Sequence, residues 1–294
     1  MEIVSCNLCG GNNTKHMYQI EGFNIVSCRK CGLVYVNPRP AGESLKTLYN
    51  HDYFQNKEKN FSEKYLGYTN YLLNRSNIEK TFAKRLDVIE KHVKTGRILD
   101  VGCALGFFLS VASKRGWDVR GIDLSGFAAD FAMKEFGEKV MNKTLFASAF
   151  PEDYFDAVTY WDVLEHVPDP KSELKEAQRV MKRGGIIAIV VPDAGSYIVK
   201  ILGKNWPEFR RIREHIYFFN KRTLTTMLNE LGFETFLIEG AGRIFNIPNL
   251  LAECEIYGKS IFRNFSKLAE WSWLSKVNLY VKPGYKFAVY ARKK

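Results

Sequence analysis

The sequence predicts an α/β protein built on a largely parallel sheet, because strand and helix patterns alternate along residues 96–294. Apolar runs such as RILDVG and IIAIVVP are typical of buried strands, whereas SGFAADFAMKEFG has the spacing of a helix. The first strand ends in a glycine-containing turn that opens a helix. Two CxxC pairs precede this region. We therefore expect a small metal-binding unit in front of a larger α/β domain.

Composition and charge exclude several classes of protein. Of the 294 residues, 46% are hydrophobic and 14% aromatic, which argues against a disordered chain. No apolar run approaches the roughly 18 residues that span a bilayer. The first 15 residues lack the pattern of a signal peptide, so we expect a cytoplasmic protein. The net charge of +11 predicts attraction to a polyanion: nucleic acid, an anionic membrane or a phosphorylated small molecule.

The first element is predicted to be a zinc ribbon over residues 1–40, with the ligands Cys6, Cys9, Cys28 and Cys31. Two intervening residues let both thiolates of a tight turn reach one zinc ion at about 2.3 Å. A glycine follows each pair, and HMYQI and FNIVS read as two short strands. Four cysteine ligands leave no open position, so the zinc is expected to be structural. A redox CxxC would need one pair only, in a βαβ context. Cys103 and Cys254 are interpreted as small buried hydrophobic residues.

Residues 41–95 follow a break at Asn37-Pro38-Arg39-Pro40 and are predicted to be helical. This segment is rich in aromatic residues, among them Tyr53 and Tyr68. The density of rings suits a substrate pocket or lid, and it suits ordinary helix packing equally well. We retain Tyr53 and Tyr68 as candidate substrate contacts.

The remaining elements are assigned in chain order. Strands are predicted at residues 97–102, 117–123, 138–147, 155–163, 186–192, 233–240 and 284–293. Helices are predicted at residues 107–115, 125–137, 169–185 and 220–232. Asp169 and Pro170 are suited to open the third of these helices, and Gly232 is suited to end the last.

A nucleoside site is predicted where the first two strands end. A glycine turn opens the first helix, and Asp123 ends the next strand, where a carboxylate accepts both ribose hydroxyls. Asp100, before the first glycine, would repel a pyrophosphate. S-adenosylmethionine carries an ammonium and a sulfonium and no phosphate, so Asp100 favours it over NAD. The turn also lacks a true GxGxxG pattern, which argues against an NAD dehydrogenase.

Several stretches then resemble class I S-adenosylmethionine-dependent methyltransferases, over about residues 75–294: LDVGCALG, GIDLS, FDAVTYWDVLEHVPDP, MKRGGIIAIVVPD and EHIYFFNKRTL. The resemblance implies a Rossmann-like sheet of seven strands in the order 3-2-1-4-5-7-6. Strand 7 would be antiparallel, with an insertion at about residues 243–282. With the ribbon in front, the chain is similar to a subgroup in sugar, polysaccharide and secondary-metabolite pathways. That subgroup includes zinc-containing C-methyltransferases of nucleotide-linked keto-deoxysugars.

The resemblance also implies a set of cofactor-binding residues. They are Asp100, Gly102, Cys103, Gly106, Asp123, Leu124, Ala147, Ser148 and Asp162. Ala104 stands where the family often has glycine. No acid follows the third strand, so the backbone of Ala147 or Ser148 would bind the adenine amine.

Two histidines are predicted at the carboxyl edge of the sheet, where ligands bind in such folds. The resemblance points to Glu214 and His215 as catalytic, with His215 as the base, and an imidazole suits proton removal at neutral pH. Alternatively, His215 caps a turn and Glu214 binds solvent or an arginine. His166 is a candidate substrate contact. It also follows Asp162 and Glu165 in a stretch where quinone O-methyltransferases use a metal ion, although many relatives hold none there.

Charge is concentrated in residues 200–222, which contain seven basic and two acidic residues. Arginine side chains suit phosphate oxygens. We therefore expect Arg210, Arg211, Arg213 and Tyr217 to contact the substrate, although the strip also reads as a solvated basic surface.

The sequence thus predicts methyl transfer from S-adenosylmethionine to a small phosphorylated acceptor, most simply C- or O-methylation of a nucleotide-linked sugar. One alternative is an RNA methyltransferase that recognises RNA through the ribbon, but no basic module interleaved with stacking aromatics is present. A second is a non-catalytic module that binds a polyanion. The expected state is a monomer or a homodimer.

Overall fold

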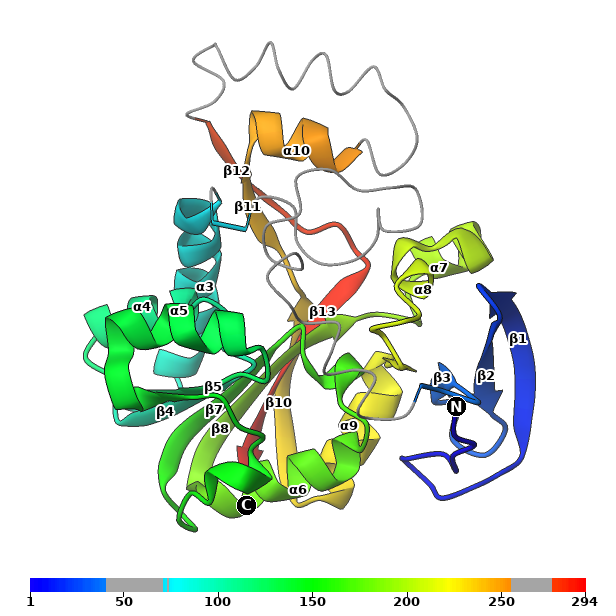
Figure 1. The fold of residues 1–294 in the computed structure, drawn as a ribbon, viewed down its shortest axis with the longest axis horizontal. Helices are drawn as coiled ribbons and strands as arrows, with labels where there is room; N and C mark the ends of the chain where they lie inside the picture. The colour runs from blue at the N-terminus through cyan, green and yellow to red at the C-terminus, as the bar shows by residue number, and fades with distance from the viewer. Residues whose placement is uncertain (41–70, 73, 255–276) are drawn as a thin grey trace.

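The computed structural model describes residues 1–40, 71–72, 74–254 and 277–294 (Figure 1). In these residues the strands form sheets of seven, four and two strands. Tyr53 and Tyr68 lie outside the described residues.

The seven-stranded sheet is the centre of the molecule. Its strands in chain order are β4 (Arg97–Val101), β5 (Asp118–Ile122), β6 (Val140–Met141), β7 (Phe155–Trp161), β8 (Met181–Pro192), β10 (Phe233–Gly240) and β13 (Lys286–Lys293). They are arranged as β10-β13-β8-β7-β4-β5-β6, and β13 is antiparallel to both of its neighbours. Counted along the chain within this sheet, the order from β6 is 3-2-1-4-5-7-6, which agrees with the expectation.

Two predicted boundaries are wrong. The helix expected over residues 169–185 ends at Val180, and the residues from Met181 onward belong to β8. The backbone is already extended at Met181, with φ of −83° and ψ of 145°, and Gly184 has a left-handed φ of 77°, so neither residue continues the helix. The third strand is also much shorter than expected, because 3₁₀ turns at Gly137–Lys139 and Phe146–Ser148 flank it.

Helices cover both faces of this sheet (Figure 1). On one face lie α3 (Arg75–Glu90), α4 (Phe107–Lys114) and α5 (Gly126–Phe136). On the other lie α6 (Pro170–Val180) and α9 (Lys221–Glu230). Neighbouring strand residues alternate between the two cores, so that Ile98 packs with the first group and Leu99 with the second.

The N-terminal unit is not separate from the larger domain. Its strands β1 (Thr14–Ile20), β2 (Phe23–Cys28) and β3 (Val34–Val36) continue into β9 (Tyr217–Phe218) to form the four-stranded sheet. The short helices α7 (Tyr197–Leu202) and α8 (Pro207–Arg210) precede β9. Trp206 and Phe209 join a buried cluster with the ribbon residues Ile25 and Val36.

The insertion near residues 243–282 contains β11 (Arg243–Asn246), α10 (Ile247–Cys254) and β12 (Asn278–Val281). β11 and β12 pair as an antiparallel two-stranded sheet, which the sequence does not predict. In the described part of the chain, no helix is long and apolar enough to cross a membrane.

Candidate active site

The turn after β4 requires glycine at two positions. Gly102 and Gly106 have φ values of 70° and 79°, and a Cβ on Gly102 would lie 2.5 Å from Val163 Cγ2. The N–H groups of Gly102 and Cys103 donate to the carbonyl oxygen of Ile122, at 2.8 and 3.0 Å. The turn is thereby fixed against the end of β5, directly beside Asp123.

Asp123 is held in place by backbone groups on both sides. Its Oδ2 accepts from the N–H of Ala104 and its Oδ1 from that of Ser125, each at 2.8 Å. Burial outweighs these hydrogen bonds and raises the pKa of Asp123 to about 6. Each oxygen keeps acceptor capacity, as a ribose diol requires.

Two apolar side chains are exposed at the ends of neighbouring strands. Leu124 is 44% exposed and Phe146 is 54% exposed. Ala147 and Ser148 follow Phe146 in the 3₁₀ turn, where their N–H groups bond to Thr144. A carboxylate beside exposed apolar residues suits a ribose with an attached base, so these residues fit an adenosine moiety.

Asp100 is not the charged carboxylate that the sequence led us to expect. Its side chain is buried and accepts a hydrogen bond of 2.6 Å from the Thr159 hydroxyl. Burial raises its pKa to about 8, so the carboxyl is mainly protonated at neutral pH. Repulsion of a pyrophosphate by Asp100 is therefore a poor criterion for the cofactor.

Arg85 is a buried cation near this turn. It is not among the site residues predicted from the sequence. Its side chain lies over the rings of Trp161 and Phe82, and the residue is only 9% exposed. Its charge acts on Asp100 and Asp162, but no carboxylate of the described residues lies within ion-pair distance. The sequence does offer one signal for a buried role of Arg85, which is its place on the apolar face of α3, three residues after Phe82.

Asp162 follows β7 on the other side of the turn and has a left-handed backbone with φ of 59°. Its Oδ1 lies 2.8 Å from Lys286 Nζ at the start of β13. Although burial opposes ionisation, Lys286 and Arg85 hold the pKa of Asp162 below its usual range. Lys286 is distant in sequence, and nothing in its local pattern indicates this contact.

The structure brings the two predicted histidines together. The rings of His166 and His215 meet edge to face, with centroids 4.6 Å apart. His166 Nδ1 lies 3.0 Å from the carbonyl oxygen of Glu214, which can only accept, so Nδ1 carries the proton and Nε2 the lone pair. Burial lowers the pKa of His166 to about 4 and that of His215 well below its usual value. Both rings are therefore neutral at pH 7.

The acid beside His215 is Glu208, not the expected Glu214. Glu208 Oε2 lies 3.4 Å from His215 Nδ1, whereas the Glu214 carboxylate pairs with Arg211 at 3.0 Å. Glu214 precedes His215 directly, and the tight turn that follows Arg211 directs the two side chains to different partners. The alternative reading, in which Glu214 binds an arginine, therefore describes this residue.

Glu165 completes a cluster of ligating groups. Both of its carboxylate oxygens are buried and have no hydrogen-bond partner, and burial raises its pKa well above the usual value. Ligand atoms of Glu165, His166 and His215 lie within 4.8 Å of one another. Such a set can relay a proton or hold a divalent cation.

Several arginines of the basic strip bond to other groups of the protein. Arg213 bonds to Glu21 of the ribbon at 3.1 Å, and Arg210 donates to Asn205 at 3.2 Å. Tyr217 is buried, and its hydroxyl donates to the carbonyl oxygen of Pro168 and accepts from Arg39. The contacts of Arg213 and Tyr217 with Glu21 and Arg39 arise because β9 pairs with the ribbon strand β3, and they do not support the substrate roles expected of Arg213 and Tyr217.

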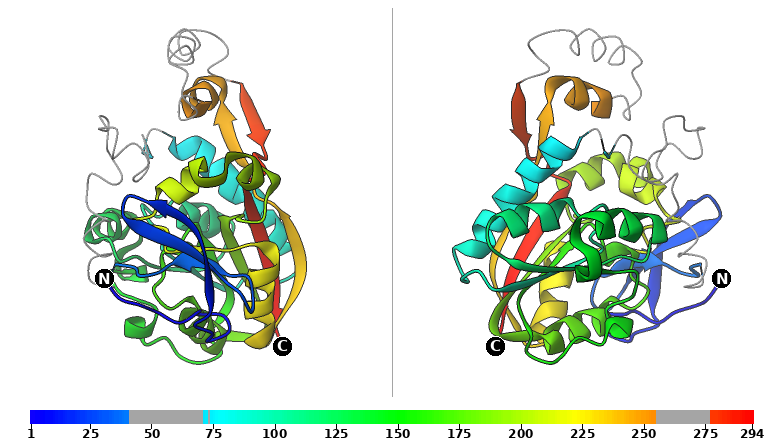
Figure 2. Two further views of the ribbon diagram at one scale, coloured as in Figure 1. Left: turned by 90° about the vertical axis from the view of Figure 1, so that its right-hand side faces the viewer. Right: turned by 60° about the vertical axis from the view of Figure 1, so that its left-hand side comes forward.

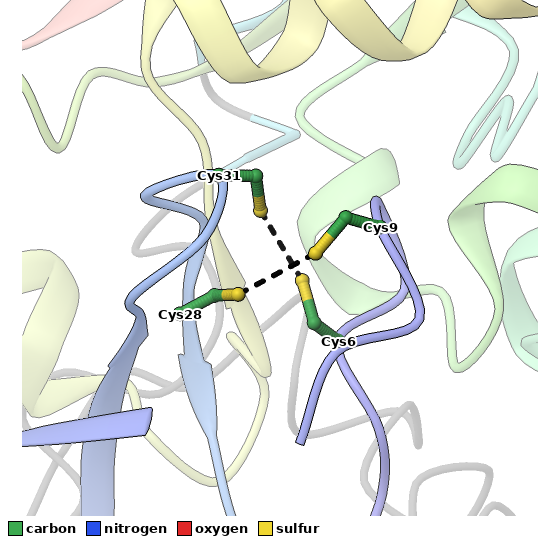
Figure 3. Close-up of side chains that lie close together, drawn as sticks. All are labelled: Cys6, Cys9, Cys28 and Cys31. Carbon is green, nitrogen blue, oxygen red and sulfur yellow. Dashed lines mark hydrogen bonds between the residues drawn. The ribbon is translucent and has the colours of Figure 1, made fainter. Parts of the chain in front are cut away.

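The four N-terminal cysteines converge as the spacing predicts (Figure 3). Sγ atoms of Cys6 and Cys31 are 3.4 Å apart, those of Cys9 and Cys28 are 3.5 Å apart, and all four lie within 4.8 Å of one another. Tetrahedral zinc with bonds of about 2.3 Å separates its sulfurs by roughly 3.8 Å. The cluster thus fits a zinc ion in donor type and in dimensions.

Comparison with known proteins identifies the larger domain. A family model described as "Methyltransferase domain" matches residues 72–237, the stretch that contains the glycine turn, Asp123 and the His166 loop. The chain belongs to the class I S-adenosylmethionine-dependent methyltransferases. The cofactor of this enzyme class is S-adenosylmethionine.

Curated relatives match parts of this enzyme. An uncharacterized protein of Methanocaldococcus jannaschii is 29% identical over 192 residues, covering 63% of this chain and 87% of that protein. The ubiquinone biosynthesis O-methyltransferase of Thiobacillus denitrificans is 32% identical, covering 49% and 67%. That of Dechloromonas aromatica is 33% identical, covering 42% and 57%. The methyltransferase thus spans little more than half of some of these relatives.

Solved structures share the fold. A SAM-dependent methyltransferase from Archaeoglobus fulgidus superposes with a TM-score of 0.51 at 22% identity, covering 76% of this chain and 99% of that one. At this identity the similarity concerns the fold alone.

Proposed function

We propose that this methyltransferase acts on an acceptor atom that must lose a proton, either a hydroxyl or a carbon beside a ketone. The observation that carries the proposal is the meeting of two neutral histidines beside Asp162, at the carboxyl edge of the sheet. Bound S-adenosylmethionine supplies an electrophilic methyl group on its sulfonium. Asp123 binds its ribose, and Arg85 receives its carboxylate.

The histidine pair removes the acceptor's proton. His215 serves as the base, and the Glu208 carboxylate, 3.4 Å from its Nδ1, stabilises the imidazolium that forms. His166 contacts the acceptor through the ring whose tautomer the Glu214 carbonyl fixes. The proton passes from the acceptor O–H or C–H to an imidazole nitrogen, and the acceptor's electron pair forms the new bond to the methyl carbon. The bond between that carbon and the sulfonium sulfur breaks, and its electron pair stays on sulfur, which leaves as the neutral thioether of S-adenosylhomocysteine. Lys286 and Arg85 keep Asp162 ionised beside this site.

The proposed acceptor is a small phosphorylated molecule, most simply a nucleotide-linked sugar. Lys200 and Lys204 are exposed on the segment that leads to α8 and His215, and their charges suit a diphosphate. The four cysteines, which we propose bind one structural zinc ion, accompany this substrate class in the family resemblance. Zinc content of about one per chain would be the expected analytical result.

A second candidate function is metal-assisted O-methylation of a hydroxyl. The Glu165, His166 and His215 cluster favours it, as does the similarity to ubiquinone biosynthesis O-methyltransferases. A divalent cation at these residues would lower the pKa of a bound hydroxyl and replace the histidine base.

The deciding experiment measures methyl transfer from labelled S-adenosylmethionine to three sets of acceptors: nucleotide-linked sugars, dihydroxy phenols and RNA. Each set is tested without added Mg²⁺ and again with it, after dialysis that leaves the zinc content unchanged. Turnover of a nucleotide sugar without added Mg²⁺ supports the base mechanism. Turnover of phenols that depends on Mg²⁺ supports the second candidate, and transfer to RNA alone refutes both.

A further inference from the structure

The ribbon contacts the methyltransferase domain at the backbone next to His215. β3 pairs antiparallel with β9, with Tyr35 opposite Tyr217. The N–H of Val36 donates to the carbonyl oxygen of Ile216 at 3.0 Å. The N–H of Ile216 donates in turn to the carbonyl oxygen of Glu165, also at 3.0 Å. The residue that follows His215 is therefore bonded to the ribbon on one side and to the Glu165 loop on the other.

Arg39 reinforces this contact from the end of the ribbon. It is 8% exposed and donates to the Tyr217 hydroxyl at 2.8 Å and to the carbonyl oxygen of Pro168 at 2.7 Å. Its Nε also pairs with Glu2 at 2.8 Å. One guanidinium thus joins the N-terminus, the loop after His166 and β9.

Packing connects the same segment to the cysteines. Tyr35 is fully buried, and its ring centroid lies 6.2 Å from that of Tyr217. Cys6 and Cys28 belong to the same buried cluster as Tyr35 and Ile216. The ribbon strands lie directly against the larger domain (Figure 2). A change in the cysteine cluster therefore has a contiguous, buried route to the His215 segment.

We propose that the ribbon positions His215: β3 and Arg39 fix the segment of residues 211–219, so that loosening the ribbon displaces His215 while the cofactor site stays formed. Arg39 is thus a positioning residue of this enzyme. The cofactor turn is fixed by its own backbone hydrogen bonds to Ile122 and Asp123, and β4 pairs with β5 and β7 in the described sheets, so we expect this turn to stay formed without Arg39.

The test compares Arg39→Ala and Arg39→Lys with the wild-type protein by hydrogen exchange. We expect Arg39→Ala to speed exchange in peptides covering residues 211–219 at least about tenfold, a loss of about 1.4 kcal/mol of local protection. Peptides from β4 and β5 should exchange unchanged, and Arg39→Lys should restore part of the protection. Tyr217→Phe, which removes one acceptor of Arg39, provides an independent and milder variant.

Lys171→Met is the matched control. Lys171 also links the ribbon to the larger domain, donating to the carbonyl oxygen of Leu8 and to Glu230, but it lies at the start of α6, away from β9. We expect this variant to leave exchange at residues 211–219 unchanged. Equal exchange in the Arg39→Ala and wild-type proteins overturns the proposal. So does a uniform rise in all sheet peptides, since that is global destabilisation.

Kinetics and zinc removal extend the test. The kinetic readout rests on the proposed function: kcat should fall in Arg39→Ala while the affinity for S-adenosylmethionine stays constant. Stripping zinc with a chelator should speed exchange at residues 211–219, a readout that does not need turnover. If exchange rises as expected but kcat does not change, positioning stands and the catalytic role of His215 fails. Unchanged exchange after verified zinc loss contradicts the proposal.

Discussion

Two parts of the carboxyl edge of the sheet are built in different ways. We call the turn after β4 with Asp123 the cofactor edge, and the cluster of Glu165, His215 and Lys286 the acceptor edge. The glycine turn, Ala104 and Asp123 come from one stretch of about 25 residues, and its backbone hydrogen bonds fix its shape. On the acceptor edge, Glu165, His215 and Lys286 come from three distant segments that pack together. The geometry of the cofactor edge is therefore set by local backbone hydrogen bonds. The geometry of the acceptor edge depends on tertiary contacts that fix the long connections between strands.

The largest effect is expected on the acceptor edge. We predict that His215→Gln lowers kcat by about 10²–10⁴-fold, the usual contribution of a general base, with affinity for S-adenosylmethionine unchanged. Turnover with the accepted substrate and calorimetry with the cofactor measure the two quantities. His16→Gln, at an exposed position in β1, is the control and should be fully active. Full activity in His215→Gln would place the base elsewhere.

The second effect concerns the unfolding free energy, which the buried carboxyl of Asp100 at the cofactor edge makes dependent on pH. Burial raises the pKa of Asp100 to about 8 in the folded protein, whereas the same carboxyl has a pKa near 3.8 in the unfolded chain. Between these pH values the unfolded chain binds fewer protons, so stability falls as pH rises through this window. Asn stays neutral and still accepts from Thr159. Asp100→Asn should therefore exceed the wild type in unfolding free energy at pH 8, by on the order of 2–5 kcal/mol.

The measurement is denaturant unfolding of the cofactor-free protein at pH 5 and pH 8. The advantage of Asp100→Asn should shrink at the lower pH. Asp130→Asn, at an exposed position on α5, should follow the wild type at both. Parallel curves for Asp100→Asn and the wild type would show that Asp100 ionises normally despite its burial.

The third effect tests the ribose contact. Asp123→Asn should weaken binding of S-adenosylmethionine by about 10–100-fold, because it removes the charge from hydrogen bonds worth roughly 1.5–3 kcal/mol each. Wild-type affinity should also fall below about pH 6, where Asp123 takes up a proton. Calorimetry across pH measures both changes. Asp118→Asn, at the opposite end of the same strand, should bind normally.

The two edges also differ in how much of each can be predicted from the sequence. The glycine turn and Asp123 follow from short-range rules, and in the structure they stand at the ends of β4 and β5 as expected. The convergence of the four cysteines is likewise set by short spacing within two tight turns.

The acceptor edge is predictable only in part. His166 and His215 were identified by their motifs, but their contact depends on the whole connection from β8 to β9. Glu208 and Lys286 could not be selected, because an ionisable residue in a helix or strand pattern is interpreted as solvated until its burial is known. For Arg85 the one available signal is its place on the apolar face of α3. The pairing of β3 with β9 likewise joins residues some 180 positions apart, and two-residue strands have no distinct pattern.

The smallest effect concerns Ala104 in the cofactor turn. Its φ of 47° is left-handed, which costs a non-glycine residue about 1 kcal/mol, and glycine removes this cost while loosening the unfolded chain by roughly 0.5 kcal/mol. Ala104→Gly should therefore raise the unfolding free energy by about 0.5 kcal/mol, with cofactor affinity unchanged because the N–H to Asp123 remains. Thermal unfolding compares it with Ala112→Gly in the middle of α4, which should lose about 1 kcal/mol. Opposite signs for the two variants would show that backbone conformation determines stability at the cofactor edge, whereas a loss in both would mean that packing governs this edge as it does the acceptor edge.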